Sequence, residues 1–190
     1  MNFKKAKWLI PALALLVIFE SVMIVQRLDK GKEPISLPAK IEEEQGSALI
    51  AFKGESQASE EVEGMVEVAM TPLKSFLLDG VDVLIEYDPK YLEILGTDPS
   101  DRFSYLARNW VEPEKKRVLV SMLETELVEG VYFEAGEEVV LTTISYLPKK
   151  SGETSLKIIG GLDETGTVLA ENGTAQKVPY SSTDFKLTIK

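Results

Sequence analysis

Paired carboxylates are the side chains of this sequence best suited to chemistry. Asp98 and Asp101 stand three positions apart, and Asp163 is followed directly by Glu164. A glycosidase needs two carboxylates that face each other across a cleft, and a calcium loop needs a dense D-x-D-x-D-G run of oxygen ligands. Neither pair has the calcium spacing, and acid pairs in loops are ordinarily solvated. We therefore expect no catalytic residue, no metal site and no cofactor.

The chain contains no His and no Cys. The absence of His excludes Ser-His-Asp and Cys-His constellations and most zinc sites. The absence of Cys excludes thiol nucleophiles and disulfides, so a core of apolar side chains has to stabilise the fold without them. We expect a protein that is not an enzyme.

The charge of the chain is strongly acidic. The whole chain has 21 Lys+Arg and 31 Asp+Glu, and from Ser47 onward there are 14 basic and 25 acidic residues, a net charge of −11. Such a surface repels phosphate backbones. We therefore expect no nucleic-acid partner.

The first apolar run has the properties of a membrane anchor. Residues 8–25 contain one charge, Glu20, and follow Lys4, Lys5 and Lys7. Eighteen helical residues span about 27 Å, close to the roughly 30 Å of a bilayer's hydrocarbon layer. Basic residues before a span favour a cytoplasmic N-terminus. A cleaved signal peptide is the alternative, but no pair of small residues follows Phe19 at the spacing that cleavage needs.

The chain therefore divides into three parts. Residues 1–26 are the cytoplasmic tip and a single transmembrane helix, and residues 27–46 are a Pro-, Gly- and Glu-containing flexible stalk without apolar periodicity. Residues 47–190 are a folded domain, which we expect outside the cell membrane as a single-pass protein. Within it, about nine short alternating segments separated by turn residues predict an all-β fold of two packed sheets.

One segment of the domain has a specific pattern. Residues 80–96 read Gly-Val-Asp-Val-Leu-Ile-Glu-Tyr-Asp-Pro-Lys-Tyr-Leu-Glu-Ile-Leu-Gly. The segment resembles the cohesin family, in which an aromatic residue with Asp-Pro, followed by Leu-Glu, lies at the end of an inner strand. A Gly-Glu turn at residues 54–55 and another at 136–137 agree with this family. The resemblance covers residues 47–190 and implies a jelly-roll β-sandwich that binds a dockerin-like protein partner through one sheet face.

The resemblance also implies where that face lies. Alternation along residues 81–87 places Val81, Val83, Ile85 and Tyr87 on one side of a strand and Asp82, Leu84 and Glu86 on the other. In cohesins the position of Asp82 often carries a polar contact residue. Glu124 and Glu126, after the strand predicted at 117–123, fall near another family contact. Each acid is also compatible with an ordinary solvated sheet face.

Two other functions stay open at this point. A carbohydrate-binding domain needs coplanar exposed aromatic rings, and Trp110 is the candidate contact for a polysaccharide. By simple alternation Trp110 lies on the side opposite to Phe103 and Tyr105, and burial in the core is expected for most of the three. A structural envelope protein that packs against its own copies is the third alternative. The single module, without a dockerin of its own, does not indicate a role in a cellulosome.

Overall fold

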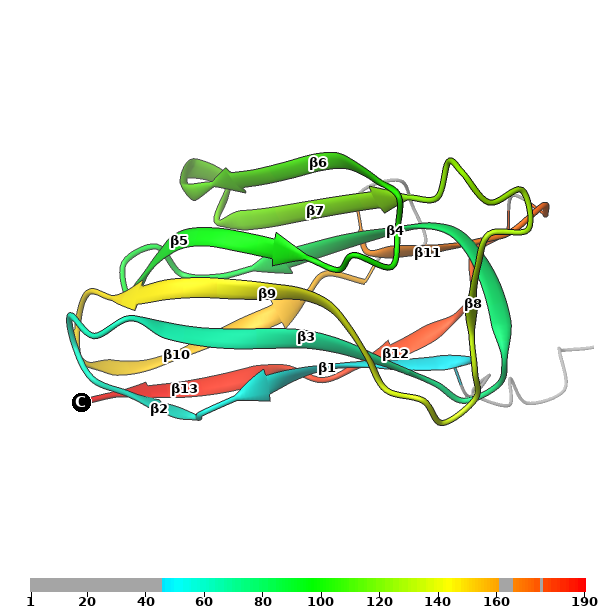
Figure 1. Ribbon diagram of the computed structural model, residues 1–190. Coiled ribbons are helices and arrows are strands. Elements are labelled where there is room, and N and C mark those ends of the chain that lie inside the picture. The colour runs from blue at the N-terminus through cyan, green and yellow to red at the C-terminus, as the bar shows by residue number, and fades with distance from the viewer. Residues whose placement is uncertain (1–45, 161–165, 175) are drawn as a thin grey trace, which may run out of the picture. The chain divides into compact units, whose positions relative to one another are not determined.

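The computed structural model describes residues 46–160, 166–174 and 176–190, which fold into two packed β-sheets (Figure 1). The first sheet has the order β12-β1-β3-β9-β5. Its strands are β12 (Tyr180–Ser182), β1 (Ala48–Gly54), β3 (Gly64–Pro72), β9 (Val139–Pro148) and β5 (Leu92–Pro99). Strand β12 runs parallel to β1, and the other neighbours in this sheet are antiparallel.

The second sheet has eight strands, and β4 is at its centre. Its main path follows β2 (Gln57–Ala58), β13 (Phe185–Ile189), β10 (Gly152–Ile158), β4 (Phe76–Glu86), β7 (Arg117–Leu123) and β6 (Tyr105–Glu112). Two shorter strands, β8 (Val131–Phe133) and β11 (Val168–Glu171), also pair with β4. In Figure 1, β6 and β7 form one edge of this sheet.

The prediction of an all-β, two-sheet sandwich is confirmed, but the described residues form thirteen strands and not about nine. The strands that the sequence did not indicate are β2, β8 and β12, which have two or three residues each. Segments this short cannot display an alternating pattern, because alternation needs at least four residues to be recognised.

The core lies between the two sheets, and the predicted inner face of β4 contributes to it. Val81, Val83 and Ile85 are buried, as is Tyr87 just after the strand, so this part of the prediction is confirmed. Each large apolar side chain that is fully buried stabilises the fold by about 1.5–3 kcal/mol. The other fully buried large side chains come from both sheets: Ile50, Met70, Leu78, Leu92, Met122, Phe133, Leu141, Ile144, Tyr146, Leu156 and Leu169.

A tight hairpin joins β6 to β7. A 3₁₀ turn, Pro113–Lys115, fills the connection. Lys116 then has φ 58°, and its N–H donates to the carbonyl of Pro113 at 3.1 Å. The left-handed conformation reverses the chain in few residues, so that β6 and β7 pair as neighbours from Glu112 and Arg117 onward.

The membrane anchor predicted at residues 8–25 and the stalk predicted at 27–46 lie outside the described residues, except for Gly46. Within the described ranges, no helix is long and apolar enough to cross a membrane.

Candidate protein-docking face

Side chains stand in ordered rows across the outward surface of β6, β7 and β4. We name this surface the docking face, and its residues are Tyr105, Arg108, Trp110 and Glu112 of β6, Arg117, Leu119 and Ser121 of β7, and Asp82, Leu84 and Glu86 of β4. In the first row Trp110 stands opposite Leu119, and Leu119 stands opposite Leu84. Residues paired in this way have their side chains on the same side of a sheet, close enough to touch. The row is therefore apolar, with Trp110 at the edge of the sheet and 50% exposed.

The second row is polar. Arg108 stands opposite Ser121, and Ser121 stands opposite Asp82. The Ser121 hydroxyl donates a hydrogen bond to the Asp82 carboxylate. The guanidinium of Arg108 lies 5.2 Å from the ring centre of Trp110, within cation–π range. This contact connects the polar row to the apolar one.

A third row carries charges of alternating sign. Glu112 stands opposite Arg117, Arg117 opposite Glu86, and Glu86 opposite Lys157 of β10. Opposite charges at facing positions support the sheet register. Glu86 is exposed, as predicted for the outward side of β4.

A β-bulge changes which aromatic side chains share this face. Tyr105 pairs with Leu123, whereas the register shifts between Leu106 and Arg108. The extra residue reverses the alternation, so Tyr105 and Trp110 lie on the same side of the sheet. The expected opposite orientation of these two residues is therefore wrong. Tyr105 is 53% exposed, so the expected burial is wrong for both of them, while Phe103 is buried.

Leu84 has the predicted outward orientation, but it is only 6% exposed. Thr167, itself buried, lies against its backbone and accepts a hydrogen bond from the Leu84 N–H at 2.9 Å. Leu84 therefore contributes to the floor of the docking face and offers little surface to a partner. The sequence of β4 could not indicate the bond to Thr167, which is 83 positions away.

The Glu124 carboxylate is engaged in hydrogen bonds within the chain. It accepts hydrogen bonds from the backbone N–H groups of Glu126 at 2.7 Å, Leu127 at 2.9 Å and Ser104 at 3.2 Å, and from the Ser104 hydroxyl at 2.9 Å. The backbone bonds from Leu127 and Glu126 lower the Glu124 pKa to about 2. Glu124 thus holds a loop, while Glu126 is exposed at that loop's surface.

The loop held by Glu124 presents apolar side chains that the sequence analysis did not single out. Val128 is 96% exposed, and Leu127 is exposed beside it. The Val128 carbonyl accepts a hydrogen bond from the Asn172 side chain at 3.1 Å, which fixes the loop from a second side. Exposed aliphatic residues on a fixed loop are a feature of binding surfaces. The sequence did contain a signal for this surface, the apolar pair Leu127-Val128 between Glu126 and Glu129.

The described residues hold no group of three or more acidic side chains that could bind a metal ion. The acid pair Asp98 and Asp101 lies at the end of β5 and just beyond it, while Asp163 and Glu164 lie outside the described residues.

The docking face itself offers side-chain contacts for recognition: exposed aromatic rings, a guanidinium and a charged border.

Comparison with solved structures identifies the architecture. A type I cohesin from Clostridium thermocellum, solved in a complex with a dockerin, superposes with a TM-score of 0.59 at 19% identity, over 76% of this chain and 99% of that one. The seventh type I cohesin of a Pseudobacteroides cellulosolvens scaffoldin gives 0.58 at 16% identity, over 75% and 92%. This is a cohesin fold.

A third cohesin structure comes from a different context. The cohesin module of a family 33 glycoside hydrolase from Clostridium perfringens gives a TM-score of 0.57 at 14% identity, over 77% of this chain and 97% of that chain. No protein-family model matches the sequence, and no curated protein matches it. The resemblance seen at residues 80–96 is therefore supported by three-dimensional structure, at the level of the cohesin fold.

Proposed function

We propose that residues 47–190 form a non-catalytic, cohesin-like interaction module, and that its docking face binds a helical, dockerin-like surface of a protein partner. The observation that carries the proposal is the pairing of Trp110 and Arg108 on an open sheet face, beside the apolar side chain of Leu119. Trp, Tyr and Arg are the residues that most often dominate binding energy at protein interfaces.

The border of the docking face fits the same function. Glu112, Arg117 and Glu86 form a charged row beside the apolar row of Trp110 and Leu119. Protein interfaces commonly have an apolar centre and a polar rim. The solved cohesin structures include complexes with dockerins, which supports a protein as the partner.

We place the module outside the cytoplasmic membrane, held there by the helix predicted at residues 8–25. The support for this placement is the sequence: three lysines precede an apolar run long enough to span a bilayer. An acidic domain without cysteine has no disulfide to form after export.

The test compares matched variants in capture from the native cell envelope, with the full chain as bait in non-ionic detergent. The variant R108E/W110A should reduce capture of the specific partner about tenfold or more, because it removes two interface anchors. The matched control is Leu95→Ala, which truncates an exposed apolar side chain on β5 of the other sheet. Equal capture by the wild type and the double variant would refute the assigned face.

A carbohydrate ligand is the second candidate, because the bulge in β6 brings Tyr105 and Trp110 to the same exposed face. Exposed aromatic rings on a flat sheet can stack against sugar rings. Binding of the full chain to insoluble polysaccharide that is lost in Trp110→Ala, but unchanged in Arg108→Glu, would favour this candidate. A purely structural envelope role predicts concentration-dependent self-association, which light scattering would detect.

A further inference from the structure

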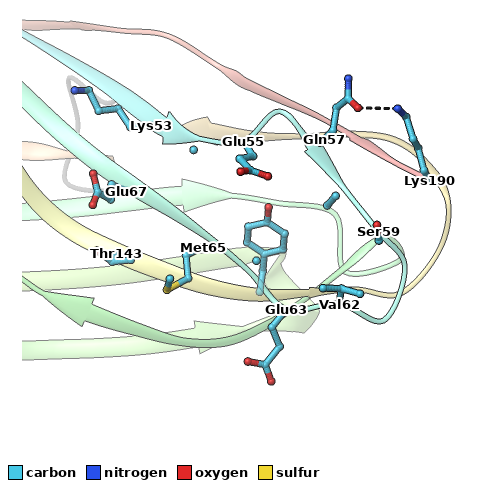
Figure 2. Close-up of a pocket in the computed structure, with 14 residues that line it drawn as sticks. Lys53, Glu55, Gln57, Ser59, Val62, Glu63, Met65, Glu67, Thr143 and Lys190 are labelled. Atoms are coloured by element: carbon cyan, nitrogen blue, oxygen red, sulfur yellow. Dashed lines mark hydrogen bonds between the residues drawn. The ribbon is translucent and has the colours of Figure 1, made fainter.

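A cleft distinct from the docking face opens where β1 runs on into β2 and where β3 begins. It has a volume of about 650 Å³. Its lining includes Glu55 after β1, Val62 before β3, Met65 on β3 and Tyr146 on β9. Figure 2 shows the cleft, with Glu55 above Met65 and Val62 in this view.

Tyr146 gives the cleft a polar group at its base. The residue is 2% exposed, so its ring is enclosed by the core. The hydroxyl end of the ring lies beside Gly64, where an added Cβ would stand 2.6 Å from the Tyr146 Cζ and hydroxyl atoms. Within the described residues this hydroxyl has no hydrogen-bond partner. No buried side-chain nitrogen or oxygen in this part of the chain lacks a partner, so the Tyr146 hydroxyl oxygen is accessible from the cleft, to water or to a ligand.

Glu55 is the carboxylate of the lining that acts on this hydroxyl. Both residues line the cleft, and burial of Tyr146 and, next, the negative charge of Glu55 raise the Tyr146 pKa. In the described part of the chain, the Glu55 carboxylate makes no hydrogen bond or ion pair, whereas Glu67 stands opposite Lys53 in the sheet and the Glu63 side chain points away from Glu55 in Figure 2. An anion would meet the Glu55 carboxylate without compensation.

The two lysines of the lining are already engaged. Lys53 forms an ion pair with Glu138, the residue directly before β9. Lys190 donates a hydrogen bond to the Gln57 side chain at 2.7 Å (Figure 2). Because neither bond engages Glu55, its carboxylate is left for a cation from outside.

Two exposed aliphatic side chains complete the cleft. Val62 and Met65 are both exposed although they are large and apolar. They provide a surface for methylene groups, because burying a CH₂ against such side chains is favourable. Methionine adapts to ligands of irregular shape. The cleft therefore has an acidic and hydroxyl-bearing part and an aliphatic part.

We propose that this cleft binds a primary ammonium group carried on a short aliphatic chain, the chemistry of a lysine side chain or a linear aliphatic amine. The ammonium group donates hydrogen bonds to the Glu55 carboxylate and the Tyr146 hydroxyl. The methylene groups pack against Val62 and Met65. The net charge of −11 from residue 47 onward raises the local concentration of such cations.

The experiment uses the full chain in non-ionic detergent, with ¹³C-labelled tyrosine rings observed by NMR at pH 7. The Tyr146 signals, assigned with Tyr146→Phe, should shift saturably on titration with n-pentylammonium. Pentan-1-ol and pentanoate, which share the aliphatic chain, should cause no saturable shift. Methylammonium should bind about tenfold more weakly, because it lacks the methylenes that contact Val62 and Met65.

Two variants separate the site from an unspecific effect. Glu55→Gln should weaken n-pentylammonium binding about threefold to tenfold through loss of the charged contact. Tyr146→Phe should weaken binding, measured by calorimetry, without lowering the melting temperature, because the hydroxyl has no protein partner to lose. The control Glu153→Gln, which removes an exposed carboxylate on β10, should leave binding unchanged.

Nα-acetyl-lysine amide and 1,5-diaminopentane distinguish the two sources of the ammonium group. Tighter binding of the lysine derivative assigns the cleft to a protein side chain, and tighter binding of the diamine assigns it to a free amine; either result supports the proposal. Equal binding of pentan-1-ol and n-pentylammonium would overturn it. Unchanged affinity in both Glu55→Gln and Tyr146→Phe would overturn it as well.

Discussion

The Thr167 hydroxyl bonds both backbone polar groups of Leu84, and it shares the Leu84 carbonyl with the Ile159 N–H, which donates to that carbonyl at 2.9 Å. The hydroxyl accepts a hydrogen bond from the Leu84 N–H at 2.9 Å and donates one to the Leu84 carbonyl at 3.3 Å. The reason lies in the sheet: β10 pairs with β4 at Ile85 and Glu86, whereas β11 pairs with β4 from Leu78 to Asp82. Leu84 lies between these two neighbours. A side chain therefore completes a hydrogen-bonding ladder at the floor of the docking face.

Thr167→Val should destabilise the domain by about 1–3 kcal/mol, because it leaves the buried Leu84 N–H without its acceptor. Valine has nearly the same shape as threonine, so packing changes little. Urea denaturation of the full chain measures the free energy of unfolding. The control Thr188→Val lies at an exposed position of β13 and should change it by less than about 0.5 kcal/mol. A neutral Thr167→Val would show that water or another group replaces the hydroxyl.

Glu124→Gln should remove a contribution to the stability of the fold that is present when the Glu124 carboxylate is ionised. Hydrogen bonds to the ionised form lower the Glu124 pKa from 4.5 to about 2 in the folded protein. A lowered pKa means that the carboxylate stabilises the fold fully above pH 4.5 and loses this effect as the pH falls towards 2. The difference in melting temperature between wild type and Glu124→Gln should therefore be constant above pH 5 and shrink below pH 4.5.

The matched control for this pH profile is Glu126→Gln, two positions along the same loop and exposed. Its melting temperature should follow that of the wild type in the same pH interval. A Glu124→Gln difference that persists undiminished at pH 2 would contradict the assignment of the stabilising hydrogen bonds to the ionised carboxylate.

Gly64→Ala should destabilise the domain through a clash with Tyr146. The new Cβ would stand 2.6 Å from the Tyr146 ring, and this ring is enclosed by the core and cannot swing away. Such overpacking costs about 1–3 kcal/mol. Gly96→Ala is the control, because its Cβ would meet nothing within 4 Å, and it should be neutral within about 0.5 kcal/mol. Equal effects of the two substitutions in urea denaturation would exclude the clash.

The sequence predicted the inner face of β4 correctly because that stretch is regular. Val81, Val83 and Ile85 alternate without interruption, and all three are in the core. The same alternation failed for Trp110, because the bulge between Leu106 and Arg108 is set by pairing with β7. No local pattern encodes such a register shift, since it depends on a partner strand.

The candidate site was predictable only in part for a similar reason. The outward orientation of Asp82 and Glu86 follows from strand periodicity. Leu84 is bonded by Thr167 and Glu124 by Ser104, both distant in the sequence, while Glu124 also accepts bonds from Glu126 and Leu127 of its own loop. Arg108 and Leu119 join the docking face through cross-strand pairing. Contacts of this kind become visible only when the strands are placed side by side.

The position of the chain relative to the membrane is the last prediction. Residues 8–25 can satisfy their backbone hydrogen bonds in lipid as a helix, and the lysines before them favour a cytoplasmic N-terminus. The full-length protein should therefore sediment with membranes and resist extraction by high salt. Protease added to intact cells or spheroplasts should cut in the predicted stalk, residues 27–46, and release a folded fragment that begins near Ser47. Recovery of a soluble mature form whose N-terminus lies between Phe19 and Arg27 would instead demonstrate a cleaved signal peptide, and the anchor would have to be abandoned.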